Sequence, residues 1–159
     1  MRAEFINPFI TSLNNTFQMM LNCRVRRGDL SLKQDGRSSH EISGVIGLTG
    51  KAVGTVVLSL SREVALKAAS ILLLAETTEI DGDVLDAVGE LTNMVAGGAK
   101  AQLETYELAV SLPNVVTGKG HEVHFPSNVT PICINFQTDW GPLTLEVGLT
   151  PVPAACAAV

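Results

Sequence analysis

Residues 42–60 read ISGVIGLTGKAVGTVVLSL, two β-rich runs on either side of the polar triplet Thr49-Gly50-Lys51. Val, Ile and Thr are favoured in strands, and glycine-containing breaks between such runs are typical of turns. We therefore predict strands over Ile42–Leu48 and Ala52–Leu60. The run Val25–Lys33 has the same character and predicts an earlier strand of the same meander.

Helices are predicted on both sides of this meander. Apolar residues recur every three to four positions from about Asn7 to Leu21, which favours an amphipathic helix with Pro8 in its first turn. After the meander, Ser61 can cap a second helix that reaches about Ala75. Asp81 or Asp83 can cap a third, longer helix that reaches about Thr105.

Three more strands are predicted after the third helix: Leu108–Leu112, Thr130–Gln137 and Leu143–Leu149, the last two joined as a hairpin. Strands and helices do not strictly alternate, so we predict an α+β fold, a mixed or antiparallel six-stranded sheet that carries about three helices in one layer. Each half is a helix followed by three strands, which suggests pseudo-duplicated halves with the extra helix between them. The length of 159 residues favours a single domain over 1–159.

Composition and charge argue against several classes of function. Hydrophobic residues make up 46% of the chain and aromatic residues 4%, so we expect a globular chain with an aliphatic core. The net charge is −5 and no basic run exceeds Arg26-Arg27, which argues against nucleic acid as a partner. Apolar runs such as Ile71–Ala75 fall far short of the roughly 20 residues of a membrane span, so no membrane insertion is expected. The scattered Cys23, Cys133 and Cys156 favour a reduced, cytoplasmic protein without a zinc site or a disulfide framework.

The third predicted helix carries its polar residues on one stripe. At about 100° per residue, Asp86, Glu90 and Asn93 fall within one sector of the helix, which Gly97, Lys100 and Glu104 extend. Apolar residues occupy the opposite side: Val84, Val88, Leu91, Val95 and Leu103. We therefore expect Glu90 and Asn93 to face outward. A polar stripe of this kind is ordinarily just a solvated face.

Three glycines in this helix are not explained by the interpretation of the stripe as a solvated face. Gly89, Gly97 and Gly98 each cost roughly 0.5–1 kcal/mol relative to alanine inside a helix. Bare backbone beside Glu90 and Asn93 is what the close approach of another macromolecule would need, whereas at Gly98 the packing of a crossing helix is the simpler explanation. Both interpretations stay open at this point.

The pattern Asp86-x-x-x-Glu90-x-x-Asn93, followed by Met94-Val95-Ala96-Gly97, resembles the signature helix of the CheC/CheX/FliY phosphatases of bacterial chemotaxis. The glycine-punctuated segment Ile42–Leu74 and the stretch from Ser111-Leu112-Pro113 to Gly118 resemble the same family. Single-domain length and a single motif point to the CheX branch. In the first predicted helix the corresponding positions are Ser12, Thr16 and Met19, so the resemblance implies one site per chain.

The resemblance implies a protein phosphatase that accelerates hydrolysis of the aspartyl phosphate of a CheY-like response-regulator receiver. It implies that Asn93 positions the in-line water and that Glu90 docks to a lysine of the receiver, with Asp86 and Gly97 in supporting roles. A neutral amide suits water positioning because it both donates and accepts hydrogen bonds without adding negative charge. The family further implies no cofactor of the chain's own, Mg²⁺ carried by the receiver, and a homodimer.

Other functions fit the sequence less well. The alternative is a non-catalytic receiver-binding or flagellar-switch-like module, against which the presence of both Glu90 and Asn93 argues. A small-molecule hydrolase would need a nucleophile, and no Gly-x-Ser-x-Gly elbow is present. His121 and His124 do not predict a metal site, because an extended segment points them to opposite faces. His40, beside Glu41, is interpreted as a surface or strand-edge histidine.

Overall fold

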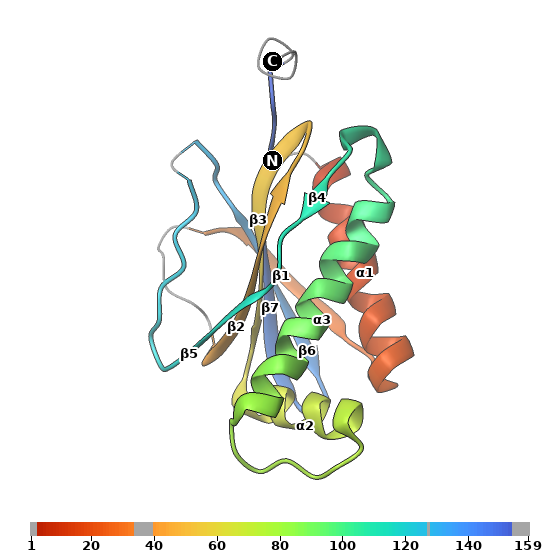
Figure 1. Ribbon diagram of the computed structural model, residues 1–159, viewed down its shortest axis with the longest axis vertical. Helices are drawn as coiled ribbons and strands as arrows, with labels where there is room; N and C mark the ends of the chain where they lie inside the picture. Colours follow the sequence, from red (N-terminus) through yellow and green to blue (C-terminus); the bar gives the residue numbers. More distant parts are fainter. Residues whose placement is uncertain (1–2, 34–39, 127, 154–159) are drawn as a thin grey trace.

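The described residues form one sheet of seven strands, with helices along one of its faces (Figure 1). The computed structural model describes residues 3–33, 40–126 and 128–153. In chain order the elements are α1 (Ala3–Leu21), β1 (Arg26–Leu32), β2 (Ile42–Thr49), β3 (Ala52–Leu60), α2 (Arg62–Leu73), α3 (Gly82–Ala101), a 3-10 turn (Glu104–Tyr106), β4 (Ala109–Val110), β5 (Asn114–Thr117), β6 (Ile132–Thr138) and β7 (Gly141–Pro151). Helices α1 and α3 lie side by side against the sheet, and α2 lies at one end of it.

The predicted α+β class is confirmed, and every strand pairing among the described residues is antiparallel. The sheet has one strand more than the six predicted. The additional strand is β5, which pairs with β2 beside the two-residue β4. This strand has four residues and directly follows Pro113, so it is too short to show an alternating pattern. Its extended conformation depends on its pairing with β2 instead.

The strand order supports the predicted pseudo-duplication. The order is β1-β6-β7-β3-β2-β4, with β5 also on β2. The first half is α1, β1, β2 and β3, and its counterpart in the second half is α3, β4 with β5, β6 and β7. When each strand is replaced by its counterpart, the result is the same strand order read from the opposite edge of the sheet. The first strands of each half pair with a strand of the other half: β1 pairs with β6, and β4 and β5 pair with β2. The two halves therefore share one core.

That core lies between the sheet and the helices. Alternate residues of the central strands β2, β3 and β7, such as Ile46, Val56 and Leu145, face the helices and are fully buried. Helix α1 contributes a row of large side chains, each at most 1% exposed: Phe5, Phe9, Leu13 and Phe17. The spacing of three to four residues explains why one side of α1 is buried along its length.

The helix ends differ from the predicted ones in two places. Helix α1 begins at Ala3 instead of Asn7, so Pro8 lies inside the helix, where it removes a single backbone hydrogen bond. Helix α3 ends at Ala101 instead of about Thr105, and the chain then turns so that the Tyr106 ring meets the Phe5 ring edge-on at 5.1 Å. This contact is made across the sequence, and helical periodicity alone does not reveal it.

The predicted caps are present on the other two helices. The Ser61 side chain accepts a hydrogen bond from the Val64 amide at 3.4 Å, which caps α2. Of the two candidate caps for α3, the structure uses Asp81, whose carboxylate accepts from the Val84 amide at 3.0 Å. The acidic cap also suits the positive end of the helix dipole.

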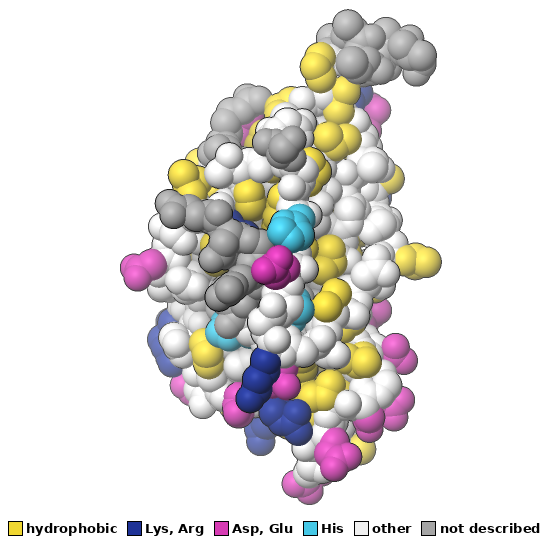
Figure 2. Space-filling view, turned by 90° about the vertical axis from the view of Figure 1, so that its left-hand side faces the viewer, with side chains coloured by type: hydrophobic (Ala, Val, Ile, Leu, Met, Phe, Trp, Pro, Cys, Tyr) yellow, Lys and Arg dark blue, Asp and Glu magenta, His cyan; other side chains and the backbone are white. Residues whose placement is uncertain are grey.

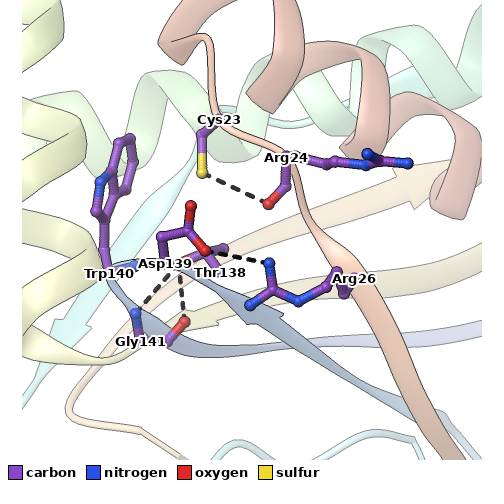
Figure 3. A network of polar contacts seen from close by, with 7 residues as sticks. All are labelled: Cys23, Arg24, Arg26, Thr138, Asp139, Trp140 and Gly141. Carbon is purple, nitrogen blue, oxygen red and sulfur yellow. Dashed lines mark hydrogen bonds and ion pairs between the residues drawn. The ribbon is translucent and has the colours of Figure 1, made fainter.

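The predicted β6–β7 hairpin is confirmed, and one hydroxyl organises its turn (Figure 3). Thr138 Oγ1 accepts from the amides of Trp140 (3.1 Å) and Gly141 (3.2 Å) and donates to the Gly141 carbonyl (2.9 Å). Beside it, Arg26 at the start of β1 pairs with Asp139 at 3.2 Å. The nearby Cys23 thiol is buried, and this burial, assisted by the charge of Asp139, raises its pKa.

The face of the sheet opposite the helices is covered by the connection between β5 and β6, and Figure 2 looks onto this side. The connection approaches β7 closely, because a Cβ at Gly148 would overlap Phe125 and Val129. Beneath it, Lys33 forms an ion pair with Glu146, and both side chains are at least 94% buried. Among the described residues, no helix has the length and hydrophobicity needed to cross a bilayer.

Candidate functional site

Helix α3 presents the predicted polar stripe to the outside. Asp86, Glu90, Asn93 and Gly97 are all exposed. The predicted apolar side is buried at every position: Val84, Val88, Leu91, Val95 and Leu103. Lys100 is exposed as well, whereas Glu104 lies beyond the end of the helix, in the 3-10 turn. The stripe therefore runs from Asp86 to Lys100.

The sheet fixes the inner side of α3 through a close contact at β2. Gly44 lies directly beneath Thr92, so that a Cβ at Gly44 would overlap the Thr92 side chain. The Thr92 hydroxyl donates a hydrogen bond to the Val88 carbonyl at 2.8 Å, within the same helix. This contact sets the depth of the helix one residue before Asn93.

Helix α1 and the chain before β5 fix the two flanks of α3. On one flank, the Ser12 hydroxyl of α1 donates to the Val95 carbonyl at 2.7 Å, and Ser12 also fills the space beside Gly98. On the other flank, a Cβ at Gly89 would lie 3.4 Å from Val115 and 3.5 Å from Pro113. Since neighbours hold it on three sides, α3 presents only its fourth side to a partner.

These contacts divide the three glycines into two kinds. Gly98 and Gly89 lie against the chain's own side chains, so packing within the fold accounts for both. Gly97 differs, because a Cβ there would meet nothing within 4 Å. No contact within the described residues explains a glycine at this exposed helical position. Of the two interpretations of the glycines, packing within the described residues therefore does not account for Gly97.

Glu90 and Asn93 are free to act on a partner. Within the described ranges 3–33, 40–126 and 128–153, neither side chain has a hydrogen bond or an ion pair. The two residues are separated by three positions, about 4.5 Å along the helix axis, and so they share one face. The carboxylate can pair with a cation, and the amide can both donate to and accept from a water molecule. The arrangement can therefore dock a charged group and position a water beside it.

A groove runs between α3 and α1 next to Asn93. Its lining residues come from both helices: Asn93, Met94, Gly97, Gly98 and Gln102 on the α3 side, and Ser12, Asn15, Thr16, Met19 and Met20 on the α1 side. The α1 residues were not predicted as part of the site. A signal was present in the sequence, because no charged residue occurs between Glu4 and Arg24 although one side of this helix faces solvent.

The histidines lie away from α3. His121 Nε2 is 2.8 Å from Ser43 Oγ and its Nδ1 is 2.7 Å from the Gly118 carbonyl, which fixes the ring against the far face of the sheet. His124 is exposed and lies 3.2 Å from Glu122. Burial lowers the pKa of His40. Across the part of the chain that the structure describes, no group of three His, Cys, Asp or Glu side chains is arranged to hold a metal ion.

Comparison with known proteins agrees with the resemblance read from α3. Residues 42–137 match the sequence model of the family described as chemotaxis phosphatase CheX. A CheY-P phosphatase CheX from Thermotoga maritima is 34% identical over 122 residues, which span 75% of this chain and 79% of that protein. A CheC-like superfamily protein from Shewanella sp. PV-4 has a similar structure, with a TM-score of 0.86 and 35% identity over 94% of this chain and 99% of its own.

A more distant relative shares the fold. It is a chain of the CheX–CheY–BeF3–Mg²⁺ complex from Borrelia burgdorferi, with a TM-score of 0.79 and 20% identity over 94% of this chain and 99% of that one. The family match covers more than half of the sequence and includes the whole of α3. On this match and on the identity to the Thermotoga protein, the chain belongs to the CheX family of chemotaxis phosphatases.

Proposed function

We propose that this chain is a phosphatase of a CheY-like response regulator and that Glu90 and Asn93 act on the aspartyl phosphate of its receiver domain. One observation carries the proposal: an acid and an amide, one turn apart and without partners among the described residues, face outward from a helix held on three sides. The Thermotoga relative is named a CheY-P phosphatase, and the Borrelia relative forms a complex with CheY, BeF3 and Mg²⁺. Both names support a CheY-like partner.

Asn93 positions the attacking water in this proposal. The water oxygen attacks the phosphorus in line with the aspartyl oxygen, the bond between phosphorus and that oxygen breaks, and the receiver recovers its carboxylate. The water loses a proton, and inorganic phosphate leaves. The transition state of phosphoryl transfer is loose, so placement of the water contributes more than a strong base would. A neutral amide can hold the water without repelling the phosphoryl oxygens.

Glu90 docks to a lysine of the receiver, which fixes the register of Asn93 over the phosphoryl group. Its carboxylate lies one turn before Asn93 and has no cation among the described residues, so it can pair with an incoming one. Asp86 lies one turn earlier and adds negative charge near the helix N-terminus, where it is favourable. Gly97 leaves room for the backbone of the partner.

The chain supplies no cofactor in this mechanism. Mg²⁺ belongs to the receiver, where it neutralises charge on the transferring phosphoryl group. Removal of Mg²⁺ with EDTA should therefore stop the reaction, although the proposal assigns no metal to this chain. A cytoplasmic location is part of the same proposal and rests on the expected receiver partner.

The proposal is tested by replacing Asn93 with alanine. We expect Asn93→Ala to lower kcat for dephosphorylation of a phosphorylated receiver from the same genome by about a hundredfold, because the water loses its position. The decay of ³²P-labelled receiver measures this rate. Asn14→Ala is the matched control, since Asn14 is an exposed amide on α1 outside the groove.

An unchanged rate in Asn93→Ala would contradict the assignment of this residue. If instead the wild-type chain binds the phosphorylated receiver but leaves its decay unchanged, the chain is a receiver-binding or flagellar-switch-like module and the catalytic proposal is wrong. Both outcomes are read from the same labelled receiver, with binding measured by retention on immobilised chain.

We also infer a homodimer. Among the described residues, β1 pairs with β6 alone, and all seven of its residues are exposed, including Leu30 and Leu32. An open strand edge with apolar side chains favours pairing with another strand, and a second copy of the same chain can supply it with twofold symmetry. Light scattering on a size-exclusion column measures the mass, and a monomer at micromolar concentration would contradict the inference.

A further inference from the structure

The exposed side of α1 is unusual for a helix in contact with water. The nineteen residues between Glu4 and Arg24 include no Asp, Glu, Lys, Arg or His. The exposed positions among them carry neutral side chains instead: Asn7, Thr11, Asn14, Asn15, Gln18, Met19, Met20 and Asn22. A solvent-exposed helical side normally carries charges. The centres of protein–protein interfaces, in contrast, are depleted in charge and enriched in methionine.

Part of this uncharged side adjoins the proposed catalytic residue. Asn15, Met19 and Asn93 line the same groove, and two exposed methionines lie together in its α1 wall, Met19 (83% exposed) and Met20 (42% exposed). The groove also contains Gly97, where no side chain of the described residues approaches the backbone. The neutral part of α1, the open glycine and the amide of α3 therefore form one continuous surface.

The proposed reaction requires a partner larger than the stripe itself. A specific interface buries about 800 Å² on each partner, far more than Glu90 and Asn93 can supply. A receiver that has Asn93 at its phosphoryl group lies over the groove, because Asn93 forms part of the groove lining. Contacts beyond α3 are therefore necessary, and on this flank α1 is the element that can make them.

We propose that the receiver docks across the groove, so that Asn15 and Met19 of α1 contact its surface beside the phosphorylated aspartate. In this arrangement α3 carries the chemistry, while α1 determines affinity and the choice among receivers. This inference rests on the proposed function. It assigns a task to the first helix, which has neither an acid nor an amide at the positions that correspond to Glu90 and Asn93.

Two neighbouring asparagines of α1 provide a matched test. Asn15 lines the groove, whereas Asn14 lies about 200° around the helix from Ser12, on the side away from α3. We expect Asn15→Arg and Met19→Ala to raise KM for the phosphorylated receiver about tenfold and to leave kcat within about twofold of wild type. Asn14→Arg should change neither constant. The dissociation constant for a beryllofluoride-loaded receiver should rise with KM, and circular dichroism checks that each variant is folded.

The outcomes separate the two proposals. If Asn15→Arg and Met19→Ala behave like Asn14→Arg, the docking surface is wrong while the catalytic assignment stands. If the wild-type chain accelerates the decay of no receiver, the proposed function fails, and binding to the loaded receiver then tests docking by itself. If the groove variants alter the mass in light scattering but leave KM unchanged, the groove is a contact between copies of this chain. The proposal that the receiver binds there is then wrong.

Discussion

At the scale of single residues, Gly97 distinguishes a solvated helix face from a docking face. Replacing it with alanine should raise the free energy of unfolding by about 0.5–1 kcal/mol, because helix propensity improves and the new methyl group meets nothing within 4 Å. The same methyl group should raise KM for the receiver, since it occupies the space that the partner backbone needs. Urea unfolding and steady-state dephosphorylation measure the two effects.

Gly98→Ala is the matched control for this prediction. Its methyl group would overlap Ser12, so we expect this neighbouring substitution to destabilise the fold instead of stabilising it. If Gly97→Ala is stabilised and keeps the wild-type KM, then no partner approaches this glycine and its supporting role is wrong.

The difference between these glycines marks the limit of sequence reasoning at this scale. Helical periodicity correctly placed Glu90 and Asn93 on the outside, because orientation on a helix depends only on position and on the buried side. What each glycine touches depends on Ser12 of α1 and on Val115 of β5, which are distant in sequence. The catalytic roles of Glu90 and Asn93 stay predictions.

At the scale of elements, the contact between β2 and α3 determines how closely α3 approaches the sheet. A methyl group at Gly44 would overlap Thr92, so Gly44→Ala should lower the free energy of unfolding by about 1–3 kcal/mol through overpacking. Outward displacement of α3 should also reduce dephosphorylation, because Asn93 follows Thr92 directly. Urea unfolding and the decay of labelled receiver measure these effects.

The double variant Gly44→Ala/Thr92→Ala makes this prediction specific. Removing Thr92 Oγ1 and Cγ2 takes away the closest overlap and leaves only the Cβ at 2.8 Å, so we expect the double variant to be more stable than Gly44→Ala alone. If the double variant instead loses the sum of the unfolding free energies lost by Gly44→Ala and by Thr92→Ala alone, then Gly44 does not serve the close approach of α3 to β2.

The elements that the sequence predicted well are those with a local signal. Long periodic helices, the Ser61 and Asp81 caps and the β6–β7 hairpin follow from residues close in sequence. Strand β5 and the end of α3 depend on pairing with β2 and on the contact between Tyr106 and Phe5. Such contacts join segments far apart in the chain, and local patterns do not contain them.

At the scale of the whole molecule, the two faces of the sheet have separate tasks. The helices and the candidate site occupy one face, while the other carries polar side chains beneath the β5–β6 connection. Lys33 and Glu146 join β1 to β7 there, and Lys33 Nζ also lies 5.4 Å from the centre of the Phe125 ring. Glu146 lies within an apolar strand and its ion pair spans 113 positions, so no local sequence pattern predicts it.

This separation predicts that the ion pair affects stability without affecting the chemistry. Lys33→Met removes one half of a buried ion pair with Glu146, which should lower the free energy of unfolding by about 3–5 kcal/mol. Lys33→Met/Glu146→Leu removes both charges and should recover most of that loss. Because the pair lies across the sheet from α3, the folded fraction of each variant should keep the wild-type kcat. Urea unfolding and receiver dephosphorylation, corrected for the folded fraction, measure both. A loss of kcat in the stable double variant would mean that the two faces of the sheet are coupled. Residues of the far face would then affect the reaction at α3.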